Sequence, residues 1–175
     1  MKGERVRRAD RTMEIRICKT DEQLARLADL ASAIWHEYFA PLLSAEQIDY
    51  MVQQYQSLEA LTRAVRQEDY TYFLGYEGEE LVGYCGVKPD GDRLFLSKLY
   101  LRSDMRGKHL STLLLNRAVE LAKKESKRAV YLTCNKYNTH SLDVYHAKGF
   151  RDIDAVVTDI GHGFVMDDYI LQLDL

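Results

Sequence analysis

The chain has 175 residues, with 24 Lys and Arg against 27 Asp and Glu, and a formal net charge of −3. This length fits one domain, and a hydrophobic share of 46% is ordinary for a globular protein, which excludes general disorder. The balanced charge excludes a general nucleic-acid binder, and no apolar run approaches the roughly 18 residues that a membrane span needs.

Residues 1–13 are rich in arginine, and we expect them to form a flexible basic tail, which leaves residues 14–175 as a single domain. The N-terminus has no apolar core segment and therefore does not resemble a secretory signal. The three cysteines fit no metal-binding spacing, and each lies in an apolar, strand-like run. We interpret Cys18, Cys85 and Cys134 as reduced core residues of a cytoplasmic protein.

A short alternating segment, 14–19, predicts a strand, and three helical patterns follow it. Two of these patterns open with a Ser/Thr-x-x-Gln sequence, at 20–23 and 44–47, which has the form of a capping box. The first helix should end near Pro41, because the residue before a proline is pushed out of the helical region. The third helical segment covers residues 57–67.

From residue 70 onward the apolar residues alternate, which predicts three strands joined by short turns into an antiparallel meander. A helical pattern over 110–124 then leads into a strand that should pair in parallel with the last strand of the meander. A helix over 139–148 is closed by Gly149, and two strands complete a mixed α/β fold around one sheet. The predicted strands cover 70–76, 81–87, 93–101, 129–134, 153–160 and 164–173, with turns at 77–80 and 89–92.

The most informative junction is the loop between strand 93–101 and helix 110–124, which holds Arg106, Gly107 and Lys108. The first turn of a helix has unpaired backbone N–H groups and a positive dipole end, so it can bind phosphate oxygens. Gly107 lets a ligand approach the backbone closely, and the two cations add charge that favours phosphate. The alternative is an ordinary exposed joint, in which glycine and cations are also common.

A second informative pair is Asn138 and Tyr145, which are seven residues apart and therefore lie on one face of the predicted helix. A polar amide and a phenol thus point in the same direction near the end of strand 129–134. The residues alone leave two interpretations open. Either the pair is functional, or Asn138 is a helix N-cap and Tyr145 is a half-buried core aromatic.

Three segments taken together are more specific: Leu99-Tyr100-Leu101, the loop Arg106-Gly107-Lys108-His109-Leu110-Ser111, and Asn138 followed by Tyr145-His146-Ala147-Lys148-Gly149-Phe150. They resemble the GCN5-related N-acetyltransferase (GNAT) superfamily. Segments 35–38 and 163–169 are similar to bacterial PaiA-like polyamine acetyltransferases. The resemblance implies the order β-α-α-β-β-β-α-β-α-β-β around one central, mostly antiparallel sheet with a parallel, splayed pair.

The resemblance also implies an enzyme that moves an acetyl group from acetyl-CoA to a primary amine by direct attack. Tyr145 would lie near the thioester sulfur as a general acid. The diphosphate would lie on backbone N–H groups of residues 106–111. The pantetheine arm would add to the strand end at 99–101, where a backbone N–H would polarise the acetyl oxygen. The implied cofactor-binding residues are Leu99, Tyr100, Leu101, Arg106, Gly107, Lys108, His109, Leu110, Ser111 and Asn138.

The chain departs from the family pattern at two places. The family usually has glycine where this chain has His109, and glycine or alanine at Ser111, so the histidine side chain must turn outward for the cradle to form. No carboxylate lies between residues 93 and 102, where many relatives carry a general base. Asp167 and Asp168 could attract a cationic amine from the last strand; the alternative is one solvent-facing and one structural carboxylate.

For the acceptor side, the resemblance implies that Trp35, His36 and Tyr38 line the pocket, with a surface histidine as the alternative for His36. The other histidines lack ligand spacing, so we expect no metal. The expected partner is a small-molecule amine, polyamine-like or amino-acid-like, and a homodimer is compatible with the family. The alternative function is a non-catalytic module that binds acyl-CoA and regulates another protein.

Overall fold

The computed structural model describes residues 13–175. Its strands are β1 Glu14–Ile17, β2 Thr71–Glu77, β3 Glu80–Asp90, β4 Arg93–Leu101, β5 Ala129–Asn135, β6 Arg151–Gly161 and β7 Phe164–Asp174. Its helices are α1 Asp21–Tyr38, α2 Ala45–Tyr55, α3 Leu58–Gln67, α4 Leu110–Lys124 and α5 Thr139–Ala147, with a short 3-10 turn at Ser103–Met105. The predicted tail lies outside the described residues except for Met13, which is buried against the sheet.

The described strands form one sheet in the order β1-β2-β3-β4-β5-β7-β6. All neighbouring strands are antiparallel except β4 and β5, which run parallel. The mixed sheet and its one parallel pair were both predicted, and both are confirmed. The helix α3 is an addition to the two helices of the family order, and the local 57–67 pattern predicted it.

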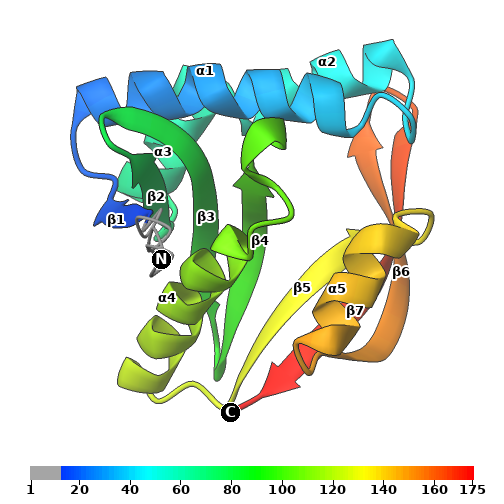
Figure 1. The fold of residues 1–175 in the computed structure, drawn as a ribbon. Coiled ribbons are helices and arrows are strands. Elements are labelled where there is room, and N and C mark those ends of the chain that lie inside the picture. The colour runs from blue at the N-terminus through cyan, green and yellow to red at the C-terminus, as the bar shows by residue number, and fades with distance from the viewer. Residues whose placement is uncertain (1–12) are drawn as a thin grey trace, which may run out of the picture.

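Two hydrophobic cores lie on opposite faces of this sheet. One joins α4 and α5 to strand residues such as Leu94, Leu96 and Leu132. The other joins α1, α2 and α3 to a row of tyrosines that includes Tyr72, Tyr84 and Tyr100. Figure 1 shows α4 and α5 in front of the sheet and α3 behind it. Apolar burial on both faces therefore fixes where the sheet lies between its helices.

The helix caps follow the sequence signals with one difference. Thr20 and Gln23 form the complete capping box that was predicted for α1. Ser44 caps α2 by accepting a hydrogen bond from the Gln47 backbone, but the Gln47 side chain does not complete the box. It donates instead to the carbonyl oxygen of Val165, 3.0 Å away. The second predicted box is therefore only half formed, because Gln47 ties α2 to β7.

The turn between β3 and β4 is shorter than predicted. The expected turn begins at Pro89, but β3 continues to Asp90, and Pro89 lies opposite Leu94 of β4. The pairing of β3 with β2 has already ended at Val87, so one edge of β3 is open at Pro89. A proline, which has no N–H to donate, is tolerated at such an open edge.

Two features of β4 shape the site: a bulge within the strand and its divergence from β5. The register between β3 and β4 shifts at Gly86 and Val87, which leaves Ser97 of β4 without a Cα partner. This bulge changes the face on which the following side chains lie, so Lys98 and Tyr100 share the face of α1 and α3. The parallel pairing of β4 with β5 covers only residues 93–95 against 129–131. Beyond these pairs the two strands separate, as the family resemblance implies.

Candidate active site

The separation of β4 and β5 opens a cavity of about 450 Å³, which we call the central cavity. One of its walls comes from residues 95–100 of β4 and the opposite wall from residues 132–135 of β5. The helices α1 and α5 and the strands β6 and β7 supply the remaining side chains. No residue of β5 pairs with residues 96–101 of β4, so the edge of β4 that borders the cavity has backbone groups available for a ligand.

A second hollow, of about 290 Å³, runs between the start of α4 and α5, and we call it the α4–α5 groove. Residues 99–101 of β4 line it, as do Arg106, Gly107 and residues 109–112. Lys108, which was predicted with them, is not among the lining residues. Tyr38, Tyr100 and Tyr145 border both hollows, which therefore meet at these rings.

The start of α4 presents an uninterrupted row of free donors. Within the described residues, no backbone or side-chain group accepts a hydrogen bond from the N–H groups of residues 107–111. Two residues of this loop have left-handed backbone conformations, Gly107 with φ +73° and His109 with φ +60°. His109 is exposed and also contributes to the lining of the groove. Such a row of donors at a helix N-terminus is suited to an anion.

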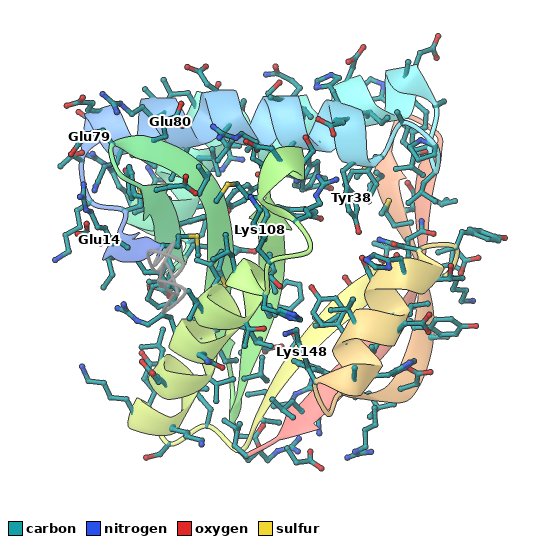
Figure 2. The ribbon with its side chains drawn as sticks, in the orientation of Figure 1. Glu14, Tyr38, Glu79, Glu80, Lys108 and Lys148 are labelled. Atoms are coloured by element: carbon teal, nitrogen blue, oxygen red, sulfur yellow. The ribbon has the colours of Figure 1, made fainter. Side chains whose placement is uncertain are left out.

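The side chains of the groove have the same preference. Arg106, His140 and Lys148 line it together with His109, and no lining residue is Asp or Glu. Lys148 reaches across the groove from the end of α5 and donates a hydrogen bond to the Thr112 hydroxyl of α4 (Figure 2). The groove therefore offers main-chain donors and cationic side chains without a competing carboxylate.

Tyr145 is placed at the junction of the two hollows by α5. Its ring packs edge-on against Phe150, with ring centroids 5.5 Å apart. Its hydroxyl has no hydrogen-bond partner among the described residues. Burial, with smaller contributions from Cys134 and Tyr38, raises the pKa of this phenol, so the proton remains on its oxygen at neutral pH. The side chain is thus a neutral, unengaged proton donor.

Asn138 and Tyr38 tie α5 to α1. The Asn138 side-chain oxygen accepts from the Ser141 backbone N–H at 3.3 Å, so Asn138 is an N-cap of α5. Its amide nitrogen donates to the Tyr38 hydroxyl, which also bonds to the Ser141 hydroxyl. Figure 2 shows Tyr38 projecting from the end of α1 toward α5. The structure therefore shows the capping interpretation of Asn138, and one amide hydrogen of its side chain remains available.

Comparison with known proteins identifies the family to which this arrangement belongs. The model of the acetyltransferase (GNAT) family matches residues 27–150, which include the cradle and the Asn138–Tyr145 helix. The chain belongs to the GNAT family. It is therefore an acyltransferase that uses acetyl-CoA as its co-substrate.

Relatives and solved structures agree with this family. The acetyltransferase is 26% identical to the spermidine N(1)-acetyltransferase of Thermoplasma acidophilum, over 89% of this chain and 97% of the relative. It is 30% identical to an uncharacterized N-acetyltransferase of Escherichia coli, over 61% and 66% of the two chains. The structure also superposes on a crystal structure of PaiA N-acetyltransferase from Thermoplasma acidophilum in complex with coenzyme A, with a TM-score of 0.77. The two sequences are 24% identical, and the superposition covers 93% of this chain and 100% of the PaiA chain.

The central cavity of the acetyltransferase contains two charged groups. Among the described residues that line the central cavity, only Lys98 and Asp168 are charged at neutral pH. Asp168 is 7% exposed, and its Oδ1 atom is buried without a hydrogen-bond partner. Burial raises the pKa of Asp168 to about 6, so most of its carboxyl groups are ionised at pH 7. Its neighbour Asp167 is paired with Lys136 at 2.8 Å.

The three residues predicted for the acceptor pocket of the acetyltransferase are separated by the structure. Trp35 and Tyr38 line the central cavity, whereas His36 does not. The His36 ring is exposed and bridges Asp49, at 2.7 Å, and the carbonyl oxygen of Ser32. These two hydrogen bonds raise its pKa. His36 thus matches the alternative, a surface histidine, and it links α1 to α2.

The cysteines of the acetyltransferase are buried and unpaired, as expected. Cys134 lines the central cavity, where a thiolate could in principle take up an acetyl group. Burial raises its pKa to about 12, so the thiol stays protonated and is a poor nucleophile. The described residues also include no group of His, Cys, Asp and Glu that could hold a metal ion, and none of the described helices is long and apolar enough to span a membrane.

Sequence reasoning missed Lys98 as a residue of the cavity. The sequence shows that residues 93–102 contain no carboxylate, but it gives Lys98 no particular role. Its side chain faces the cavity because of the bulge at Ser97, and no simple alternation predicts that position. Asp168 was a candidate in the sequence, but only the structure shows that it is buried and that its neighbour Asp167, not Asp168, has Lys136 as its ion-pair partner.

Proposed function

We propose that the protein is an N-acetyltransferase that moves acetyl from acetyl-CoA to the primary amine of a small molecule by direct attack. The observation that carries this proposal is the junction at Tyr145, where the cationic α4–α5 groove meets the central cavity. The spermidine acetyltransferase relative supports a small-molecule amine as the acceptor. The protonated state of Cys134 supports direct attack over an acetyl-enzyme.

The groove is the proposed site of the coenzyme. The free N–H groups of residues 107–111 would hold the diphosphate, and Arg106 and Lys148 would add positive charge beside it. The unpaired edge of β4 at residues 99–101 would bind the pantetheine arm as an added strand. The one free amide hydrogen of Asn138 would donate to that arm. We also propose that residues 14–175 form a single acetyltransferase domain.

When bound, acetyl-CoA supplies the acetyl group as a thioester whose sulfur leaves as a thiol. Tyr145 is proposed as the general acid, because its phenol is neutral, unbonded and adjacent to both hollows. A backbone N–H of residues 99–101 would stabilise negative charge on the acetyl oxygen. Asp168 would hold the acceptor's ammonium group and accept one proton from it, which leaves a neutral amine to attack the thioester carbon. After Tyr145 has protonated the leaving sulfur, the second proton of that nitrogen would return to the phenolate. Trp35, Tyr38 and Tyr100 would form the aromatic walls around the acceptor.

The proposal predicts the effect of removing one hydroxyl group. We expect Tyr145→Phe to lower kcat by about 10-fold or more, because the leaving sulfur loses its proton donor. The KM for acetyl-CoA should change little, since the ring that packs on Phe150 remains. Release of free coenzyme thiol under saturating substrates measures both parameters. Tyr137→Phe makes the same change on a side chain that is 72% exposed, and it should be neutral.

Two further measurements complete the test of the proposed function. The wild-type protein is screened for thiol release against a panel of amines, and coenzyme binding is followed in parallel by calorimetry. Thiol release that depends on an amine supports the proposal. Coenzyme binding without release across the whole panel would favour the non-catalytic module, and an unchanged kcat in Tyr145→Phe would remove this tyrosine from the mechanism.

A further inference from the structure

The charged residues of the central cavity indicate which kind of acceptor it binds. We propose that the acceptor is an amino carboxylate, an amine that also bears an anionic group, and that Lys98 is the residue that selects it. This inference rests on the proposed function, since it concerns the acceptor site of the same acetyl transfer. It goes further by choosing between the two acceptor classes, polyamine-like and amino-acid-like, that the sequence leaves open.

The first argument is that Lys98 has no anionic partner. Its ammonium group donates to the Ser97 hydroxyl at 2.7 Å and lies 5.0 Å from the centre of the Tyr70 ring. No carboxylate of the described residues lies within ion-pair distance of it. Desolvation by the surrounding walls lowers its pKa to about 8, which still leaves it mainly protonated at pH 7. The charge of Glu68 also acts on this ammonium group, but Glu68 is paired with Arg63 at 2.9 Å and forms no ion pair with Lys98. The direct neighbours of the enclosed cation are therefore a hydroxyl and a ring, and it is suited to bind an anion.

The second argument is the separation of the two charges. Lys98 lies on β4, the strand at one side of the divergence, and Asp168 lies on β7, opposite Asn135 of β5 at the other side. Both side chains line the cavity, yet they form no ion pair with each other. A ligand with an ammonium group for Asp168 and a carboxylate for Lys98 would compensate both charges, and the neutral aromatic walls between them would contact its carbon atoms.

The third argument concerns polyamines. A polyamine carries a second ammonium group along its chain, and binding it requires carboxylates at more than one place. Among the described residues that line the cavity, Asp168 is the only carboxylate, and a second cation directed toward β4 would meet the like charge of Lys98. The relative named for spermidine shares 26% identity with this chain, which leaves room for a different acceptor.

The experiment compares acceptors that differ in one terminal group. Short ω-amino acids are tested beside the α,ω-diamines and n-alkylamines of the same chain length, and α-amino acids are tested beside their amides. We expect kcat/KM for the best amino carboxylate to exceed that of its matched diamine and alkylamine by about 10-fold or more, as for one charge-assisted hydrogen bond.

Variants at Lys98 locate the selectivity. We expect Lys98→Gln to raise the KM of the amino carboxylate by about 10-fold or more while kcat changes less, and to remove the preference over diamines. Lys98→Arg should retain the preference because it keeps the charge. Lys88→Gln is the matched control: Lys88 also lies over the Tyr70 ring, at 5.5 Å, but does not line the cavity. Unchanged coenzyme binding verifies that each variant is folded.

The two proposals can fail separately. If diamines are the better substrates, or if Lys98→Gln leaves the preference intact, the amino carboxylate inference is wrong while acetyl transfer stands. If no amine releases thiol, the proposed function fails, and binding decides the inference: calorimetry then titrates the same matched compounds into the coenzyme-loaded protein. Stronger binding of amino carboxylates that Lys98→Gln abolishes supports the inference, and equal or weaker binding overturns it.

Discussion

At the scale of single residues, Asp168 shows how a site can oppose stability. Its carboxyl group is 7% exposed, one oxygen has no partner, and burial raises its pKa from 3.8 to about 6. The folded chain therefore holds this proton more tightly than the unfolded chain does. As pH rises from about 4 to about 6, the unfolded state ionises first, and the contribution of Asp168 to the free energy of unfolding falls.

The corresponding prediction is that Asp168→Asn stabilises the protein at pH 7, by about 1–3 kcal/mol, because it removes a buried charge. The gain should disappear at about pH 3, below the unfolded pKa of 3.8 and the folded pKa of about 6, where the wild-type carboxyl is mainly protonated in both states. Urea unfolding at the two pH values measures the difference. Acetyl transfer should fall in the same variant, since the acceptor's ammonium loses its counter-charge. A variant less stable than wild type at pH 7 would show that the charge is compensated.

The sequence predicted the functional residues unevenly at this scale. Helical spacing placed Tyr145 on the face of Asn138 but left a core aromatic as the alternative, and only the family resemblance gave Tyr145 a role. The structure puts both residues beside the central cavity. Lys98 could not be predicted, because its direction depends on a one-residue bulge that no periodicity reveals. The strand–loop–helix pattern predicted free donors at the start of α4, and the resemblance implied residues 106–111. The range was wrong at Arg106, because its N–H donates to the Ser103 carbonyl oxygen at 3.3 Å, whereas residues 107–111 are free.

At the scale of elements, the start of α4 is held in an unusual conformation. His109, the residue before the helix, has φ +60° and ψ 19°, a left-handed backbone that costs a residue with a Cβ about 1–2 kcal/mol. No side-chain hydrogen bond caps this end of α4, and the donors of the first turn stay free. This conformation explains why a glycine is easily accommodated where this chain has histidine.

We therefore predict that His109→Gly leaves the free energy of unfolding unchanged or raises it by up to about 1 kcal/mol, since relief of strain outweighs the added flexibility. His109→Val should lower it by about 1–2 kcal/mol, because a branched side chain resists positive φ. Coenzyme affinity should persist in the glycine variant, whose donors are main-chain. Thermal unfolding and calorimetric titration of both variants provide the comparison, and equal behaviour of the two would contradict the strain argument.

Element ends were predicted well where the cap is local and less well where a distant strand competes. Thr20 and Gln23 close their box because both partners lie on α1. The Gln47 side chain does not complete its capping box, because it donates to the Val165 carbonyl oxygen, which is far away in the sequence. The extension of β3 through Pro89 has the same origin, since it depends on where β2 stops pairing.

At the scale of the whole molecule, all three thiols are enclosed by the two cores. Burial raises the pKa of Cys18 to about 11 and of Cys134 to about 12, and it raises that of Cys85 as well. We predict that a thiol reagent at pH 8 labels the native protein at least ~100-fold more slowly than it labels a free cysteine. Unfolding should make all three thiols reactive. Absorbance of a chromogenic disulfide measures this, and rapid labelling before unfolding would be inconsistent with buried thiols.

The fold as a whole was the most predictable part. Alternating and helical periods placed every strand and helix of residues 14–175, and the resemblance implied the sheet with one parallel pair. Neither approach could give the charges of the central cavity, because these come from side chains on strands and helices distant in sequence. Periodicity reports which face of an element is buried, but it does not report which opposing element the face meets.

The separation of β4 and β5 has one more consequence, for how long the protein lasts in a cell. Along residues 96–101 the interior strand β4 pairs with β3 but not with β5, so the sheet is weakened at this position. A coenzyme bound along this edge of β4 would bind the native state and not the unfolded one, and would therefore lower the fraction of molecules open to proteases. The amount of enzyme in the cell would then depend on the concentration of acetyl-CoA. When acetyl-CoA is scarce, more of the enzyme would be degraded.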